Sequence, residues 1–139
     1  INNYAKNDLL PPPVKKKYSK EHMLMLVFIY YFKSILSISD IQKLLEPITQ
    51  KYFPGEGSID LTALYEEIMK LELEQIEPLA KDVTRKFSLA NDSFQNVSEE
   101  EKDFLHKFAF ICMLSFDVYV KKQVIENLID QMSREEKKE

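Results

Sequence analysis

The longest unbroken hydrophobic stretch of the chain runs from Met23 to Phe32, and all ten of its residues are apolar or aromatic. Its branched and aromatic residues also suit a strand, but Ser19 as an N-cap and Glu21 in the first turn favour a helix. A helix that is apolar all round is usually buried on most sides, and ten residues are too few to span a bilayer, which takes about 20. We therefore predict a helix that begins after Ser19, ends near Ile35 and forms the centre of the core.

Beyond this stretch the apolar residues recur at spacings of three and four, which is typical of amphipathic helices. Ser37 and Asp40 form a variant capping box ahead of the first such stripe, which consists of Ile38, Ile41, Leu45, Ile48 and Tyr52. Pro47 lies inside the stripe and is expected to kink or divide the helix. Gly55 and Gly57, the only two glycines, follow closely, so we predict a linker at residues 53–57.

The remaining residues predict two long helices. The first begins at Ser58 or Asp60, is expected to bend near Pro78, and carries the stripe Leu61, Leu64, Ile68, Leu71, Leu79, Val83 and Phe87. After a loop at residues 91–93, Ser98 and Glu101 form a capping box that begins the second helix. This helix is predicted to extend to Met132, and residues 133–139 are expected to fray.

The second long helix carries an apolar seam that repeats about every 3.5 residues. The seam consists of Phe104, Phe108, Ile111, Ser115, Val118, Ile125, Ile129 and Met132, with Lys122 at the skipped position. Such a repeat fits a dimer interface, and it fits packing within the protein's own core equally well. The aromatic residues of this region could also enclose a small effector, namely Phe104, Phe108, Phe110, Phe116 and Tyr119.

Several short motifs in the first third resemble, in their order, the MerR-type winged helix-turn-helix family. They are Ile1-Asn2-Asn3-Tyr4, Leu9-Leu10-Pro11-Pro12-Pro13, Lys15-Lys16-Lys17, Tyr18-Ser19, the hydrophobic run, Ser37-Ile38-Ser39-Asp40-Ile41 and Leu44-Leu45. The chain also resembles, over most of its length, the bacterial domain-of-unknown-function family 1836, which has such a head and a helical C-terminal part. It departs from the MerR pattern in its short wing, which lacks Gly-Tyr-Arg, and in starting inside the expected recognition helix.

The resemblance implies an all-α fold with a partial MerR-like winged helix-turn-helix at residues 1–53, whose first helix is missing, and a helical bundle body at residues 58–133. It implies a DNA-binding surface made of Asn2, Asn3, Tyr4, Lys6, Lys15, Lys16, Lys17 and Tyr18. Asparagine can pair with adenine, and lysines that follow a rigid triproline can bind phosphates. The alternative is a polar turn and a solvated loop, with both tyrosines packed against the core.

Composition and charge agree with a helical globular protein. The chain is 45% hydrophobic and 30% charged, and its scarcity of glycine argues against a turn-rich β protein. Residues 1–36 carry a net charge of +4 and the remaining residues −8. A basic head on an acidic body can bind a polyanion locally, although an unevenly charged surface explains the same pattern.

The sequence offers little for catalysis or for a metal. His22 and His106 are far apart, and no Cys or His cluster has metal-ligand spacing, so we expect no metal, no cofactor and no enzymatic activity. Cys112 is the only cysteine, and its apolar neighbours predict a buried, inert thiol in a reducing cytoplasm. Asp117 interrupts an apolar run. It either faces water or, if it faces the interior, needs a partner, and Lys121 and Lys122 are near on the same helix.

Taken together, these patterns predict a cytoplasmic transcriptional regulator that binds double-stranded DNA as a homodimer and has no membrane segment. The alternative is a helical protein–protein interaction module without DNA binding, and its sign would be an exposed apolar groove. An enzyme is the third class, and it would require a catalytic constellation that the sequence does not display.

Overall fold

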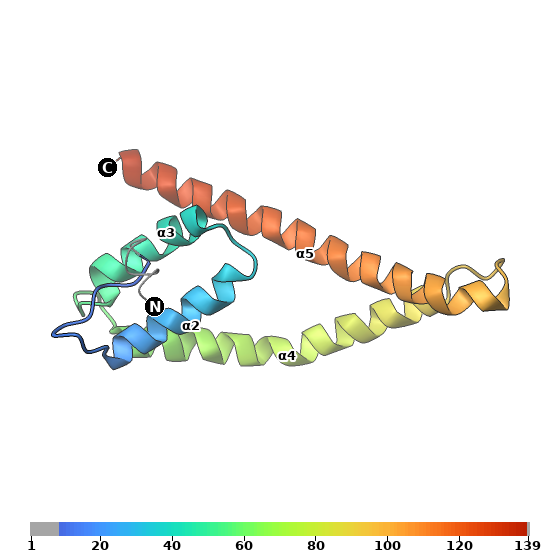
Figure 1. The fold of residues 1–139 in the computed structure, drawn as a ribbon, viewed down its shortest axis with the longest axis horizontal. Coiled ribbons are helices and arrows are strands. Elements are labelled where there is room, and N and C mark those ends of the chain that lie inside the picture. The colour runs from blue at the N-terminus through green and yellow to red at the C-terminus, as the bar shows by residue number, and fades with distance from the viewer. Residues whose placement is uncertain (1–8, 139) are drawn as a thin grey trace. The chain divides into compact units, whose positions relative to one another are not determined.

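The structure is a computed structural model that describes residues 9–138, with side chains to residue 135. It contains α2 (Lys20–Lys33), α3 (Ile38–Pro47), a short π-helical turn η1 (Ile48–Tyr52), α4 (Leu61–Asn91) and α5 (Glu99–Lys138) (Figure 1). The described residues contain helices and no β-strand, so the predicted all-α fold is confirmed. The chain divides into two compact units, residues 1–69 with 124–139 and residues 70–123. The predicted linker at residues 53–57 lies inside the first unit.

α2, α3 and α4 begin after the predicted capping residues Ser19, Ser37 and Asp60, because side-chain oxygens there accept amide protons that a helix start leaves unpaired. α5 begins after Ser98, whose Oγ donates to the Glu101 carboxylate at 3.0 Å. Ser37 Oγ accepts the Asp40 N–H at 3.1 Å, and Asp60 Oδ1 accepts the Ala63 N–H at 2.7 Å. The helix predicted to end near Ile35 ends at Lys33. The last helix, predicted to extend to Met132, continues to Lys138, since the added segment consists largely of residues that favour helices.

Pro47 divides the second predicted helix, as expected. α3 ends at this residue, and the chain continues as η1, in which the Phe53 N–H donates to the Ile48 carbonyl at 2.8 Å. Proline has no N–H for the carbonyl one turn earlier, so the wider π-helical turn follows where the regular hydrogen-bond ladder is interrupted. In contrast, α4 continues through Pro78 as one helix.

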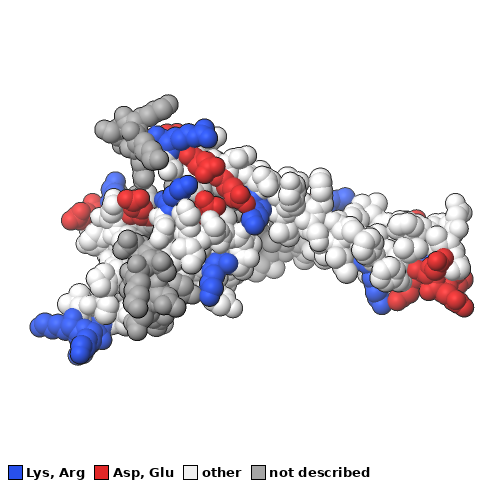
Figure 2. Space-filling model, turned by 45° about the horizontal axis from the view of Figure 1, so that its top comes forward, with Lys and Arg blue, Asp and Glu red and all other residues white. Residues whose placement is uncertain are grey.

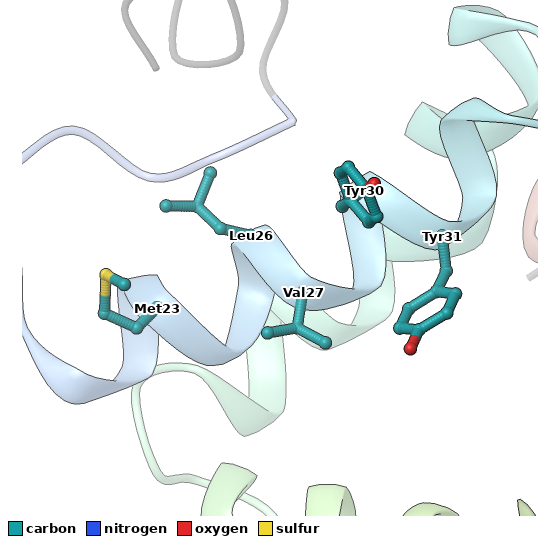
Figure 3. A pocket seen from close by; sticks show the side chains of 5 residues that line it. All are labelled: Met23, Leu26, Val27, Tyr30 and Tyr31. Atoms are coloured by element: carbon teal, nitrogen blue, oxygen red, sulfur yellow. The ribbon is translucent and has the colours of Figure 1, made fainter.

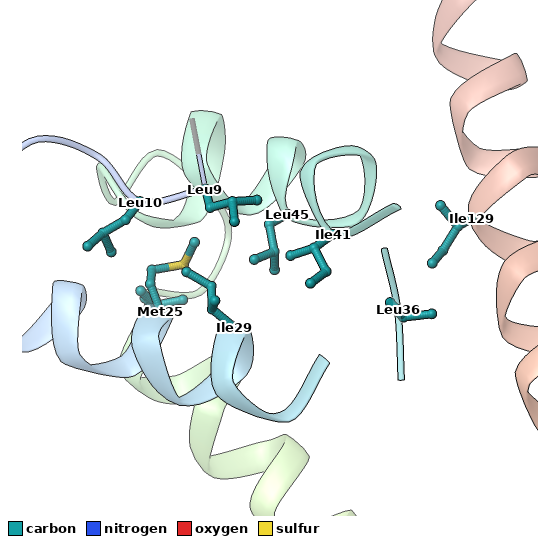
Figure 4. Close-up of a cluster of buried hydrophobic side chains, with 9 residues drawn as sticks. Leu9, Leu10, Met25, Ile29, Leu36, Ile41, Leu45 and Ile129 are labelled. Carbon is teal, nitrogen blue, oxygen red and sulfur yellow. The ribbon is translucent and has the colours of Figure 1, made fainter. Parts of the chain in front are cut away.

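The hydrophobic core of the first unit draws on residues that are far apart in the sequence (Figure 4). Each side chain of this core is at most 7% exposed, and the set comprises Leu9, Leu10, Met25, Ile29, Leu36, Ile41, Leu45, Leu61 and Ile129. Ile129 belongs to the C-terminal part of α5, so this part of α5 contributes to the core of the first unit. Burial of such side chains stabilises the unit by about 2 kcal/mol each.

The prediction that α2 is buried on most sides is wrong for one face of this helix. Met25 and Ile29 are buried in the core, whereas Met23, Tyr30 and Tyr31 are exposed. The exposed face, with Leu26 and Val27, lines a shallow open pocket (Figure 3). The reason is that the first unit contains few elements, and the described ones pack against only one side of α2.

The second unit is a helical hairpin formed by residues 70–91 of α4 and 99–123 of α5. Lys86 on α4 is only 8% exposed and pairs with Asp82 and with Asp117 on α5. The partner predicted for Asp117 on its own helix is therefore wrong, because the neighbouring helix supplies a lysine at the same level. His106 Nε2 lies 2.7 Å from the Ser93 carbonyl and ties the connecting loop to α5.

The prediction of a buried thiol at Cys112 is also wrong, because this side chain is exposed. Its apolar neighbours in the sequence are distributed around α5, and several of them are exposed as well. Apolar residues beside a cysteine in the sequence therefore do not bury it when the helix has a packed neighbour on one side only.

Candidate nucleic-acid interface

The three consecutive lysines of the sequence form a tight turn with Val14, here called the lysine turn. The Lys17 N–H donates to the Val14 carbonyl at 3.0 Å, and the two residues form an isolated antiparallel bridge. Lys15 and Lys16 have φ angles of 53° and 63°. Two consecutive left-handed residues are the signature of the type I′ turn, the tightest reversal that a hairpin uses.

The lysine turn is strained, because lysine is a poor residue for this backbone conformation. Type I′ turns usually contain Asn and Gly, and a residue with a side chain in the left-handed region costs about 1 kcal/mol or more. The three lysines are also exposed side by side, and Figure 2 shows basic side chains gathered at the tip of this loop. Backbone strain and mutual charge repulsion therefore coincide in one exposed turn, a combination that is characteristic of functional sites.

His22 anchors the loop that carries the lysine turn. The side chain is 2% exposed, and its Nδ1 accepts the Ser19 N–H at 3.0 Å. The neutral ring therefore carries its proton on Nε2, which lies 3.0 Å from the Pro11 carbonyl and 3.3 Å from the Pro12 carbonyl. One buried ring thus completes the cap of α2 and holds the triproline through the Pro11 and Pro12 carbonyls.

Aromatic rings enclose His22 on two sides. The ring of Tyr18 meets it edge-on at a centroid distance of 5.1 Å, and the ring of Phe53 does so at 4.9 Å. Tyr18 follows the lysine turn directly and remains 36% exposed. The chain therefore enters the turn from a proline run fixed by His22 and leaves it through a tyrosine that packs on the same ring.

The structure brings together four of the residues predicted to bind DNA, namely Lys15, Lys16, Lys17 and Tyr18. The other four, Asn2, Asn3, Tyr4 and Lys6, lie outside the described residues. The structural role of His22 was not predicted from the sequence, in which the residue was weighed only as a metal ligand. A signal was present, because His22 occupies the third helical position after Ser19, where a capping box has its second partner.

Two other kinds of feature are absent from the described part of the chain. No group of three or more His, Cys, Asp or Glu side chains between residues 9 and 135 is arranged to hold a metal ion. Among the described helices, none has both the length and the apolar character needed to cross a membrane.

Residues 1–68 match the family described as Domain of unknown function (DUF1836). The match includes the lysine turn, α2, α3 and the beginning of α4, so the predicted similarity to this family is confirmed for these residues, slightly under half of the chain. No curated protein and no solved structure matches the chain significantly. The likeness to the MerR type stays a prediction.

Proposed function

We propose that this protein is a DNA-binding transcriptional regulator and that the lysine turn contacts the phosphate backbone of duplex DNA. The observation that carries the proposal is an exposed, strained turn of three lysines whose loop is anchored by a buried histidine. A solvated loop without function has no need of two adjacent left-handed lysines, since Asn and Gly would form the same turn without the strain.

The chemistry of the lysine turn suits phosphates better than bases. Ammonium groups are compact point charges that bind phosphate oxygens from many directions, and phosphate contacts position a protein on DNA without reading its sequence. A polyanion also removes the repulsion among Lys15, Lys16 and Lys17, so binding relieves part of the cost of the turn. The chain carries a net charge of −4, which confines attraction to such local basic surfaces.

Fluorescence anisotropy with mixed-sequence duplex DNA at low salt tests this function. The variant Lys15→Glu/Lys16→Glu/Lys17→Glu should lose most of its affinity for DNA. The control Lys70→Glu/Lys81→Glu/Lys121→Glu changes the net charge equally at exposed lysines of the second unit and should bind much more strongly. Equal losses in the two variants would show that total charge, and not the lysine turn, governs binding.

A protein–protein interaction module is the second candidate function, and the exposed apolar face of α2 favours it. Met23, Leu26, Val27, Tyr30 and Tyr31 line a pocket there that is open to solvent. Clustered apolar side chains with tyrosine hydroxyls are typical of protein-binding surfaces. If duplex DNA does not bind at low salt, this candidate replaces the first.

A further inference from the structure

The second unit exposes far more apolar surface than an isolated helical hairpin normally does. Between residues 70 and 123, fifteen large apolar side chains are exposed. At about 100 Å² for each half-exposed side chain, the exposed apolar area of this unit is roughly 1,500 Å² in total. Residues 71–80 of α4 are exposed on every side of the helix.

One stripe of this surface has the spacing of a coiled-coil seam. Phe104, Phe108, Ile111 and Val118 lie on α5 and are between 51% and 65% exposed. With Ser115 they form the exposed part of the 3.5-residue repeat, here called the outer seam. Phe104 and Phe108 already stack on each other at a centroid distance of 5.8 Å, so the seam presents an ordered pair of rings to solvent.

The outer seam is not the face with which α5 packs against α4. Between residues 99 and 123 of α5, the less exposed residues are Lys102, Leu105, His106, Ala109, Phe110, Met113, Leu114 and Asp117. Phe110 contacts Phe87 of α4 at a centroid distance of 5.5 Å, and Asp117 pairs with Lys86. At about 100° per residue, the contacting face and the outer seam lie on opposite sides of the helix. The intramolecular core therefore does not use residues 104–118 of the seam.

We infer that the outer seam of α5 binds the same seam of a second copy of this chain. A repeat with a period of 3.5 residues is self-complementary, because two identical helices can interlock their side chains along it. A stable interface needs about 800 Å² from each partner. The four apolar residues of the seam supply roughly 400 Å² of it, and exposed residues that flank them on α5, such as Lys107, Cys112 and Tyr119, border the same face. The inference does not rest on DNA binding.

Light scattering during size-exclusion chromatography of the full chain, without DNA, tests this inference. The unmodified protein should elute as a dimer across a concentration series. Phe108→Glu places a carboxylate in the seam and should weaken dimerisation at least tenfold. Phe116→Glu is the matched control, because Phe116 lies on the same helix and is 66% exposed, against 51% for Phe108, but is about 120° from the middle of the seam; it should leave the dimer intact.

Circular dichroism on each variant separates loss of the interface from loss of the fold. A monomeric Phe108→Glu variant with unchanged helicity supports the inference. If this variant unfolds, Phe108→Ala provides the measurement, since alanine favours helix and truncates the ring without adding charge; it too should weaken dimerisation. An unmodified protein that stays monomeric at high concentration would overturn the inference. Two other results would also overturn it: a dimer that stays intact in both Phe108 variants, or a dimer that Phe116→Glu disrupts as strongly as Phe108→Glu does.

Discussion

Replacement of His22 by alanine should destabilise the first unit by about 3 kcal/mol. The substitution removes the acceptor of the Ser19 N–H and the donor to the Pro11 carbonyl, and each such hydrogen bond contributes about 1 kcal/mol. It also removes a ring, 2% exposed, that packs against Tyr18 and Phe53. The cavity and the lost ring contacts add roughly 1 kcal/mol or more.

Replacement of His22 by glutamine separates the two roles of the ring. A glutamine at this helical position can accept the Ser19 N–H and restore the capping box. It cannot reproduce the ring that reaches the triproline. The glutamine variant should therefore recover about 1 kcal/mol of the loss, a typical value for a capping interaction, and remain less stable than the unmodified protein.

Urea unfolding followed by tyrosine emission measures this difference. The chain has no tryptophan, and six of its seven tyrosines lie between residues 1 and 69, so the signal reports mainly on the first unit. Circular dichroism of the same samples follows both units together. A loss of less than 1 kcal/mol in the alanine variant, or identical stabilities of the alanine and glutamine variants, would refute the anchoring role of His22.

Three further predictions concern stability. Lys15→Asn/Lys16→Gly provides the preferred type I′ residues and should raise the free energy of unfolding by about 1–2 kcal/mol while weakening DNA binding; urea unfolding and anisotropy check the two effects. Hydrogen bonds from Lys86 and then Arg85 lower the pKa of Asp82. The ionised carboxylate therefore stabilises the fold fully above the ordinary aspartate range, and this contribution is lost as the pH falls through the lowered pKa. In Asp82→Asn, the free energy of unfolding should depend less steeply on pH below about pH 4. Ile129→Ala, at a site 2% exposed, should destabilise the first unit by about 2–5 kcal/mol in urea, and a smaller effect than about 1 kcal/mol would contradict its place in the core.

Local patterns in the sequence predicted most of the helices, because caps and apolar spacing act over a few residues. Ser37, Asp60 and Pro47 behave as their chemistry requires. The contact of Ile129 with the core of the first unit could not be predicted. Ile129 lies more than 80 residues along the chain from most of the other core residues. The same limit explains Asp117, whose partner lies on the other helix of the hairpin.

The candidate site was predicted in composition but not in conformation. The lysine run is visible in the sequence, whereas its left-handed backbone is not, because a run without Asn or Gly predicts ordinary φ angles. The exposure of one side of α2 was hidden for a related reason. An apolar pattern shows which residues can be buried. The number of helices and loops that pack around them decides how many are in fact buried.

The measurement that tests the central claim most directly is the salt dependence of DNA binding. Anisotropy across a salt series should give a linear fall of log affinity with log salt, and each phosphate contact adds about 0.9 to the slope. The variant Lys15→Gln/Lys16→Gln/Lys17→Gln removes three positive charges and should reduce the slope by up to about 2.7. An unchanged slope in this variant would contradict the claim that the lysine turn binds DNA phosphates.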